Sequence, residues 1–420
     1  MLKMYKTLKN ITKNPLFAGS LIMIVGTNLA SFFAYLYHLI FGRILGPSSY
    51  SELAVFISLA TIFSAGFTAM GTVIMKFASI EKDKELKILF MWVNRIALKS
   101  GIILFLLLLA SSPFLSSFLK INIKIILLFP FVVVLIYFCS IYRSFLQGLL
   151  MFVQSVVVTN IDIISRLGIG FILVSIGLGV MGASSAILIG MFLSLVVSLL
   201  YLKKYFIKGN KSYKKSDEVI KFGLPVLVMT ISITSLITTD VVLVKHFFDA
   251  HQAGIYASIS TLGKIIVYGT TPIAAVMFPI IAKRHAANKR SVKVLLLSTL
   301  LTFAIGGGVL LIYYFFPSQA VNLLFGSKYL EATKYLFIFG FFSLFYVLDY
   351  LLIYFYLSVD KIMASYIVPV GAVVQALAII IKHDSLLSVI YASVLALGIL
   401  LVLLISYGLY SYRHYFLKLE

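Results

Sequence analysis

Residues 386–408 read LLSVIYASVLALGILLVLLISYG and contain no charged side chain. An α-helix needs about 20 apolar residues to cross the hydrocarbon core of a bilayer. Runs of similar length recur from Phe17 to Gly408, and short polar gaps separate them. Because a bilayer leaves no water to satisfy the backbone, such runs must form helices that bond internally. The sequence therefore predicts an all-α, polytopic membrane protein.

The apolar runs predict about twelve transmembrane helices, divided between two six-helix lobes around a central cavity. The predicted helices are 17–41, 51–78, 90–111, 125–146, 155–177, 182–202, 220–245, 254–281, 292–315, 333–357, 362–381 and 386–408.

The composition agrees with a membrane protein rather than a soluble one. Of the 420 residues, 61% are hydrophobic and 12% are charged, whereas about a quarter are charged in a typical soluble domain. The formal net charge of +21 raises the alternative of a nucleic-acid-binding protein. Its basic residues, however, lie in short gaps between apolar runs, which favours a membrane surface facing anionic lipid. We expect no nucleic-acid partner.

Lysine and arginine gather in alternate gaps, which predicts the orientation of the chain. Most of the 35 basic residues lie in gaps on the same side as the N-terminus, and this side is expected to be cytoplasmic. Both termini are then cytoplasmic, in a multi-pass protein of the cytoplasmic (inner) membrane. The basic residues assigned to the opposite side are Arg43, Lys120, Lys124, Lys245, Lys328, Lys334 and Lys382.

The longest polar segment divides the chain into two halves. We predict an N-terminal lobe over 1–202, a basic cytoplasmic linker over 203–221 and a C-terminal lobe over 222–420. The halves show weak similarity at an offset of 203 residues, where Tyr50–Leu53 aligns with Ala253–Tyr256. Six helices in each half would make the repeat parallel and place a cavity between the lobes. The alternative is chance similarity between apolar helices.

Charged residues inside predicted helices are candidates for function. A charge near the bilayer centre costs roughly 2.5–3.5 kcal/mol on insertion scales and usually faces a cavity or a partner. Arg166 and Asp162 lie one helical turn apart, so Asp162 either orients an anion-binding Arg166 in a cavity or forms a structural pair with it. Lys264 shares a helix face with polar side chains at spacings of three and four. We expect Arg166 and Lys264 to face a cavity and to bind an anionic substrate there.

Further charged residues are weaker candidates. Arg95, Lys99 and Arg143 lie toward the predicted cytoplasmic ends of their helices, where they either assist cargo loading or extend toward the headgroups. Asp240 and Asp349 lie within predicted helices as candidates for ion coupling. The alternative for each is a hydrogen-bonded or paired buried acid.

Several enzyme classes lack their motifs in this sequence. It has no Walker phosphate-binding loop and no cluster of His, Cys and carboxylates at metal-ligand spacing. Cys139 is the single cysteine and is interpreted as a packing residue. We expect neither an enzyme nor a cofactor.

Three short motifs resemble those of polysaccharide repeat-unit flippases, the O-antigen-type transporters of the multidrug/oligosaccharidyl-lipid/polysaccharide exporter superfamily. Gly42–Tyr50, GRILGPSSY, resembles the R-x-L-G-P-x-x-Y-G signature, except that Ser51 stands where the family usually has glycine. Phe145–Gly148, FLQG, and Leu324–Tyr329, LFGSKY, resemble two further family turns. The three motifs occur in the expected order, and the resemblance spans the whole chain.

The resemblance implies movement of a polyprenyl-diphosphate-linked oligosaccharide across the membrane by alternating access. It also implies membrane lipids and a glycan polymerase or ligase as candidate partners in polysaccharide biosynthesis. A diphosphate is a dense anion that arginine binds well. Two alternatives are a cation-coupled multidrug exporter of the same superfamily and a non-transporting membrane scaffold of a glycan-synthesis complex.

Overall fold

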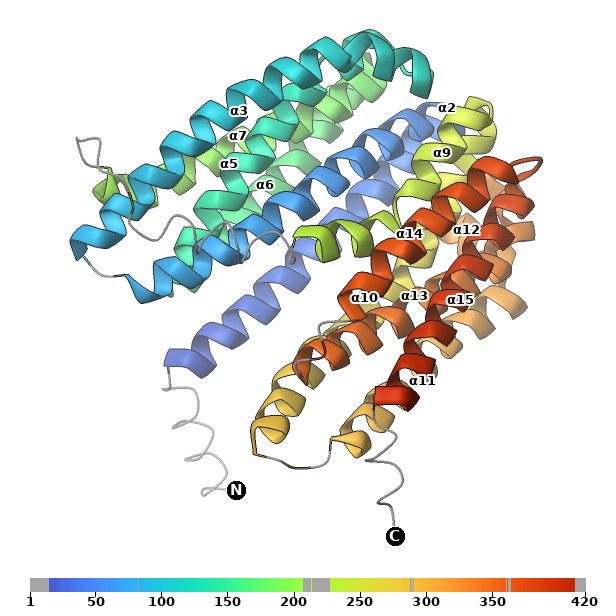
Figure 1. Cartoon of the computed structure of the whole chain (residues 1–420). Coiled ribbons are helices and arrows are strands. Elements are labelled where there is room, and N and C mark those ends of the chain that lie inside the picture. Colours follow the sequence, from blue (N-terminus) through green and yellow to red (C-terminus); the bar gives the residue numbers. More distant parts are fainter. Residues whose placement is uncertain are drawn as a thin grey trace, which may run out of the picture. The chain divides into compact units, whose positions relative to one another are not determined.

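The computed structural model describes residues 15–81, 83–206, 213, 227–287, 289, 291–359, 361 and 364–411 (Figure 1). A helix coincides with the described part of each of the twelve predicted segments. Among the described residues, eight helices are long and apolar enough to cross a membrane, or nine if a bent pair counts as one span. The prediction of an all-α polytopic membrane protein is confirmed.

The described elements are helices and short helical turns. They are α2 (Pro15–Ile80), α3 (Asp83–Leu119), α4 (Ile123–Ile126), α5 (Phe129–Gly148), α6 (Phe152–Leu173), a π-helical turn (Val174–Leu178), α7 (Gly179–Leu202), a 3₁₀ turn (Lys203–Tyr205), α9 (Thr239–Phe247), α10 (Ala250–Ala286), α11 (Val292–Phe315), α12 (Pro317–Leu324), a 3₁₀ turn (Ser327–Ala332), α13 (Thr333–Ser358), α14 (Ala364–Ile381) and α15 (Leu386–Ser411).

Helix α2 contains the first two predicted spans, joined without a loop. The join is at Gly46, whose φ of 74° and ψ of 171° lie outside the helical region. Glycine adopts this positive φ without a side-chain clash, and Pro47 then starts the next helical stretch with its fixed φ. The predicted gap between spans is therefore a single kink in the structure.

The chain forms two compact units. The first comprises residues up to Phe41 together with Phe63–Leu227, and the second comprises Gly42–Ile62 together with Val228–Glu420. Residues 42–62, which the sequence analysis places in the first lobe, thus pack with the second unit. Most of the predicted linker 203–221 lies outside the described residues.

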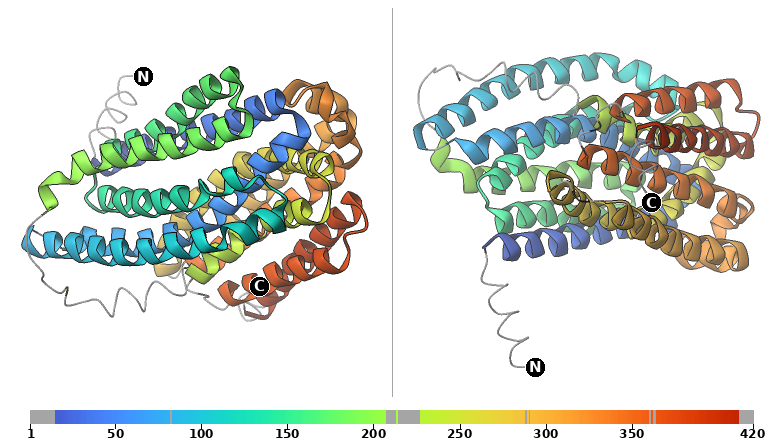
Figure 2. Two further views of the ribbon diagram at one scale, coloured as in Figure 1. Left: turned by 90° about the horizontal axis from the view of Figure 1, so that it is seen from above. Right: turned by 60° about the horizontal axis from the view of Figure 1, so that its bottom comes forward.

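In the first unit, small residues allow helices to pack closely. Helices α3, α5, α6 and α7 run side by side (Figure 2). A Cβ atom added to Gly190 of α7 would lie 2.6 Å from the backbone oxygen of Asp162 in α6. Small residues at such contacts are typical of membrane helices, because they let backbones approach each other.

In the second unit, α10 packs against α13, and α13 and α14 pack against α15. The predicted helix 220–245 corresponds here to two described helices, Leu227–Ser235 and Thr239–Phe247, which are bent by 50° relative to each other. Gln375 of α14 donates from Nε2 to the carbonyl oxygen of Leu236 at 3.1 Å. This hydrogen bond satisfies the carbonyl of Leu236, which lies in the bend between the two helices.

Candidate functional site

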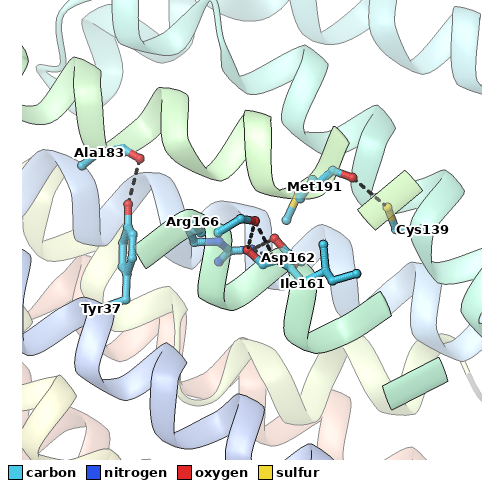
Figure 3. Close-up of polar contacts among 8 residues, drawn as sticks. Tyr37, Cys139, Ile161, Asp162, Arg166, Ala183 and Met191 are labelled. Carbon is cyan, nitrogen blue, oxygen red and sulfur yellow. Dashed lines mark hydrogen bonds and ion pairs between the residues drawn. The ribbon is translucent and has the colours of Figure 1, made fainter. Parts of the chain in front are cut away.

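Arg166 and Asp162 form an ion pair within α6 of the first unit (Figure 3). Arg166 donates from Nη2 to Oδ1 of Asp162 at 2.8 Å and to Oδ2 at 2.9 Å. The two side chains are 14% and 19% exposed. Nε of Arg166 is buried and makes no hydrogen bond with any described residue. One N–H of the guanidinium is thus left for another acceptor.

Residues from two other helices surround this pair. The Arg166 guanidinium carbon lies 6.0 Å from the ring centroid of Tyr37 in α2, within the range of a cation–π contact. Tyr37 is held in turn by its hydroxyl, which donates to the carbonyl oxygen of Ala183 in α7 at 2.8 Å (Figure 3). Gly190 of α7 packs against the backbone of the Asp162–Arg166 turn. These contacts with α2 and α7 fix the position of Arg166 within the first unit.

Cys139 lies buried in α5 and donates from Sγ to the carbonyl oxygen of Met191 at 3.5 Å. Its sulfur interacts electrostatically with Arg143, Asp162 and Arg166. Arg143 lies one turn after Cys139 on α5, the helix that brings Cys139 near the ion pair.

Loss of one partner of this ion pair is expected to destabilise the protein. Asp162→Asn leaves Arg166 without its counter-charge, and we expect a cost of about 1–3 kcal/mol. Adding Arg166→Gln should cost less than the sum of the two single changes, because one interaction is removed in both. Thermal unfolding of the purified protein in detergent measures this coupling, and strict additivity would contradict the pairing.

Lys264 of α10 is the candidate cation of the second unit. Its side chain is half-buried, and no hydrogen bond or ion pair joins it to another described residue. Asp240, at the start of α9, is completely buried and interacts electrostatically with Lys264. The Asp240 carboxylate accepts a hydrogen bond from the Tyr256 hydroxyl at 2.9 Å. Tyr256 thus holds the Asp240 carboxyl group in the neighbourhood of Lys264, which has no hydrogen bond or ion pair with a described residue.

Asp349 of α13 is 1% exposed. Neither of its carboxyl oxygens makes a hydrogen bond with a described residue. It interacts electrostatically with Tyr346 on the same helix. A buried acid without a hydrogen bond is costly, so the structure keeps Asp349 a candidate for ion coupling.

The structure brings two of the three family-like motifs together within the second unit. The hydroxyl of Tyr329 donates to the carbonyl oxygen of Gly42 at 2.7 Å, and Phe325 contacts the ring of Tyr50. Arg43 donates from Nη2 to the carbonyl oxygens of Asn322 and Leu323 at 2.8 and 3.2 Å. We call this contact between residues 42–51 and 322–329 the clasp.

Each contact of the clasp has a simple physical basis. The carbonyls that Arg43 binds lie at the C-terminal end of α12, where a helix leaves acceptors unpaired and favours a cation. Gly254, in the second turn of α10, lies directly against the backbone of Pro47, and a Cβ there would overlap the Pro47 carbonyl oxygen. Arg43 therefore binds a neighbouring helix end in addition to any contact with headgroups.

Lys245 is a buried residue that the sequence analysis assigned to a gap. It is 1% exposed, and its Nζ donates to Oγ of Ser51 at 2.8 Å. It also interacts electrostatically with Glu52. Ser51 is the one position where the first motif departs from the family pattern. This departure was the one sign in the sequence of the Lys245 contact, because a serine hydroxyl at a glycine position can accept a hydrogen bond.

No group of three or more His, Cys, Asp or Glu side chains within the described ranges could hold a metal ion.

The fold is similar to those of solved membrane transporters. The chain is similar to the inward-facing conformation of a multidrug resistance MATE family transporter of the MOP superfamily, with 14% identity, a TM-score of 0.74, and coverage of 88% of this chain and 93% of the other. It is also similar to the lipid II flippase MurJ in its inward closed conformation, with 16% identity, a TM-score of 0.73, and coverage of 93% and 87%. No curated protein matches the chain.

The sequence itself matches a family described as polysaccharide biosynthesis protein over residues 16–285. The match covers more than half of the chain, and the protein therefore belongs to this family.

Proposed function

We propose that this protein is a flippase that moves polyprenyl-diphosphate-linked oligosaccharide units across the cytoplasmic membrane by alternating access. Membership of a polysaccharide biosynthesis family supports a glycan cargo. The fold is similar to that of a lipid II flippase, which supports a lipid-linked cargo. Both termini would lie in the cytoplasm, as the distribution of lysine and arginine predicts.

The observation that carries the proposal is one incompletely paired cation inside each unit. Lys264 has no hydrogen bond or ion pair to another described residue, and Nε of Arg166 has no acceptor within the described part of the chain. A cation of this kind is costly in a membrane protein unless a ligand or water reaches it. A diphosphate supplies the acceptors that both groups lack, because its oxygens accept several charge-assisted hydrogen bonds.

The acids have separate proposed roles. Asp162 orients Arg166 through its two hydrogen bonds. Asp240 and Asp349 are proposed to couple transport to an ion. An ion shifts the balance between two transporter states only if it binds them with different affinity, and a buried carboxyl is suited to that difference because its hydration changes.

Reconstitution tests the proposal directly. Purified protein in liposomes should move a fluorescent polyprenyl-diphosphate oligosaccharide to the opposite leaflet, where a membrane-impermeant quencher reaches it. Protein-free liposomes and liposomes with the Arg166→Ala/Lys264→Ala double variant are the controls. Equal movement by the double variant would indicate that these cations do not serve the cargo. Absence of movement together with export of cationic drugs would favour the multidrug-exporter alternative.

A further inference from the structure

A groove of about 530 Å³ lies on the first unit between α3, α5 and the end of α7. Leu98, Leu199 and Phe206 contribute apolar walls, and Asn94, Arg95 and Tyr142 contribute polar groups. The groove is therefore mostly apolar with polar groups from α3 and α5, unlike the wholly apolar hollow lined by Phe105 and Phe192 in the same unit.

The two neutral polar groups of the groove satisfy each other. The Tyr142 hydroxyl donates to Oδ1 of Asn94 at 2.6 Å, and Asn94 donates from Nδ2 to the carbonyl oxygen of Phe90 at 2.8 Å. Among the described residues that line the groove, Arg95 is the one that carries a charge. A ligand of this groove would therefore meet the positive charge of Arg95 and apolar side chains.

The level of the groove in the bilayer follows from the length of α3. This helix has 37 residues, far more than the roughly 20 that span the hydrocarbon at 1.5 Å per residue. If Leu119, which precedes Lys120, marks one boundary, the other falls close to Lys99. Arg95 then lies at the headgroup level on the side that the charge distribution predicts to be cytoplasmic.

Other residues at this end of the unit agree with a headgroup position. Lys203 and Lys204 follow α7 directly and are exposed. Trp92 lies one turn from Arg95, and tryptophan favours the membrane interface. The surroundings of the groove are thus positively charged, as an anionic headgroup requires.

We infer that this groove binds an anionic phospholipid of the inner leaflet, with the phosphate at Arg95 and an acyl chain along Leu98 and Leu199. The apolar walls exclude a sugar chain, which needs polar partners. The single cation suits a phosphate group, and the surrounding lysines add selectivity for a headgroup with net negative charge. This site is distinct from the ion pair of Arg166 and is independent of the proposed cargo.

Trp92 makes the inference testable without a label, because it is the only tryptophan of the chain. Full-length protein is reconstituted in phosphatidylcholine vesicles that contain a fixed fraction of acyl-brominated lipid. Brominated phosphatidylglycerol is expected to quench Trp92 fluorescence at least about twofold more than brominated phosphatidylcholine at the same mole fraction. Equal quenching by the two lipids would overturn the inference.

Variants assign the preference to the groove. Arg95→Gln should abolish the preference for phosphatidylglycerol, whereas Arg95→Lys should keep most of it because the charge remains. Lys124→Gln, an equal change of charge at an exposed position beyond the other end of α3, is the matched control and should leave the preference intact. Retained preference in Arg95→Gln would contradict the site, provided its thermal unfolding matches the wild type.

A competition experiment separates the phospholipid from a polyprenyl lipid. Unbrominated polyprenyl phosphate at a small mole fraction should leave the quenching by brominated phosphatidylglycerol unchanged. Restoration of Trp92 fluorescence by that addition would show that the groove prefers a polyprenyl lipid and would overturn the assignment.

Discussion

Gly254→Ala is expected to lower the melting temperature of the protein by roughly 4 °C or more, because the clasp cannot accommodate a methyl group at this position. A Cβ at Gly254 would overlap the carbonyl oxygen of Pro47 and would lie 2.7 Å from its Cα. These are backbone atoms next to the kink at Gly46, so no flexible side chain can move aside. Thermal unfolding in detergent gives the measurement.

The direction of the change in melting temperature distinguishes a steric overlap in the clasp from an effect of helix propensity. Alanine is a better helix former than glycine by about 1 kcal/mol in a helix interior. Gly307 of α11 has no atom within 4 Å of an added Cβ, so Gly307→Ala should leave the melting temperature unchanged or raise it. A rise for both variants would mean that residues 42–51 do not pack against α10 as described.

Lys264→Met is expected to reduce transport of the lipid-linked oligosaccharide about tenfold to a hundredfold while the protein stays folded. A charge-assisted hydrogen bond is worth about 1.5–3 kcal/mol, and each 1.4 kcal/mol lost from the transport step lowers its rate tenfold. The fold should tolerate the change, because Lys264 makes no hydrogen bond or ion pair with another described residue. Flux in liposomes and thermal unfolding are measured on the same preparation.

Lys245→Met is the matched control, since it removes the same charge from the same unit. Lys245 bonds Ser51 and interacts with Glu52, so its loss should lower the melting temperature and leave the flux per folded molecule near normal. The proposal for Lys264 would be wrong if the two variants exchanged these phenotypes, or if both only destabilised the protein.

The spans could be predicted closely because hydrophobic length is a local property of the sequence. The predicted helix 292–315 has the same bounds as α11, and 333–357 differs from α13 by one residue. The kink at Gly46 was not predicted, because polar residues between two apolar runs suggest a loop. Nothing local indicates that Pro47 packs against Gly254, a contact that depends on how distant segments fold together.

In the candidate site, too, contacts within one helix could be predicted and contacts between distant segments could not. Asp162 and Arg166 pair as their spacing on one helix predicts. The contact of Arg166 with Tyr37 and the burial of Lys245 depend on tertiary packing, which one sequence does not encode in any short motif. For Lys245, a position near a predicted helix end suggested an exposed residue, but its side chain is buried and bonds Ser51 of the clasp.

The assignment of residues 42–62 to the second unit has a consequence for dividing the chain. The chain enters the second unit at Gly42, leaves it after Ile62 and returns after Leu227. Cleavage in the polar stretch near residue 210 would therefore not yield two self-sufficient halves. The N-terminal fragment would retain 21 residues that belong to the other unit. The C-terminal fragment would lack Arg43, the donor to the carbonyl oxygens of Asn322 and Leu323, and Ser51, the acceptor for Lys245. We expect such fragments to accumulate only when both are synthesised in the same cell.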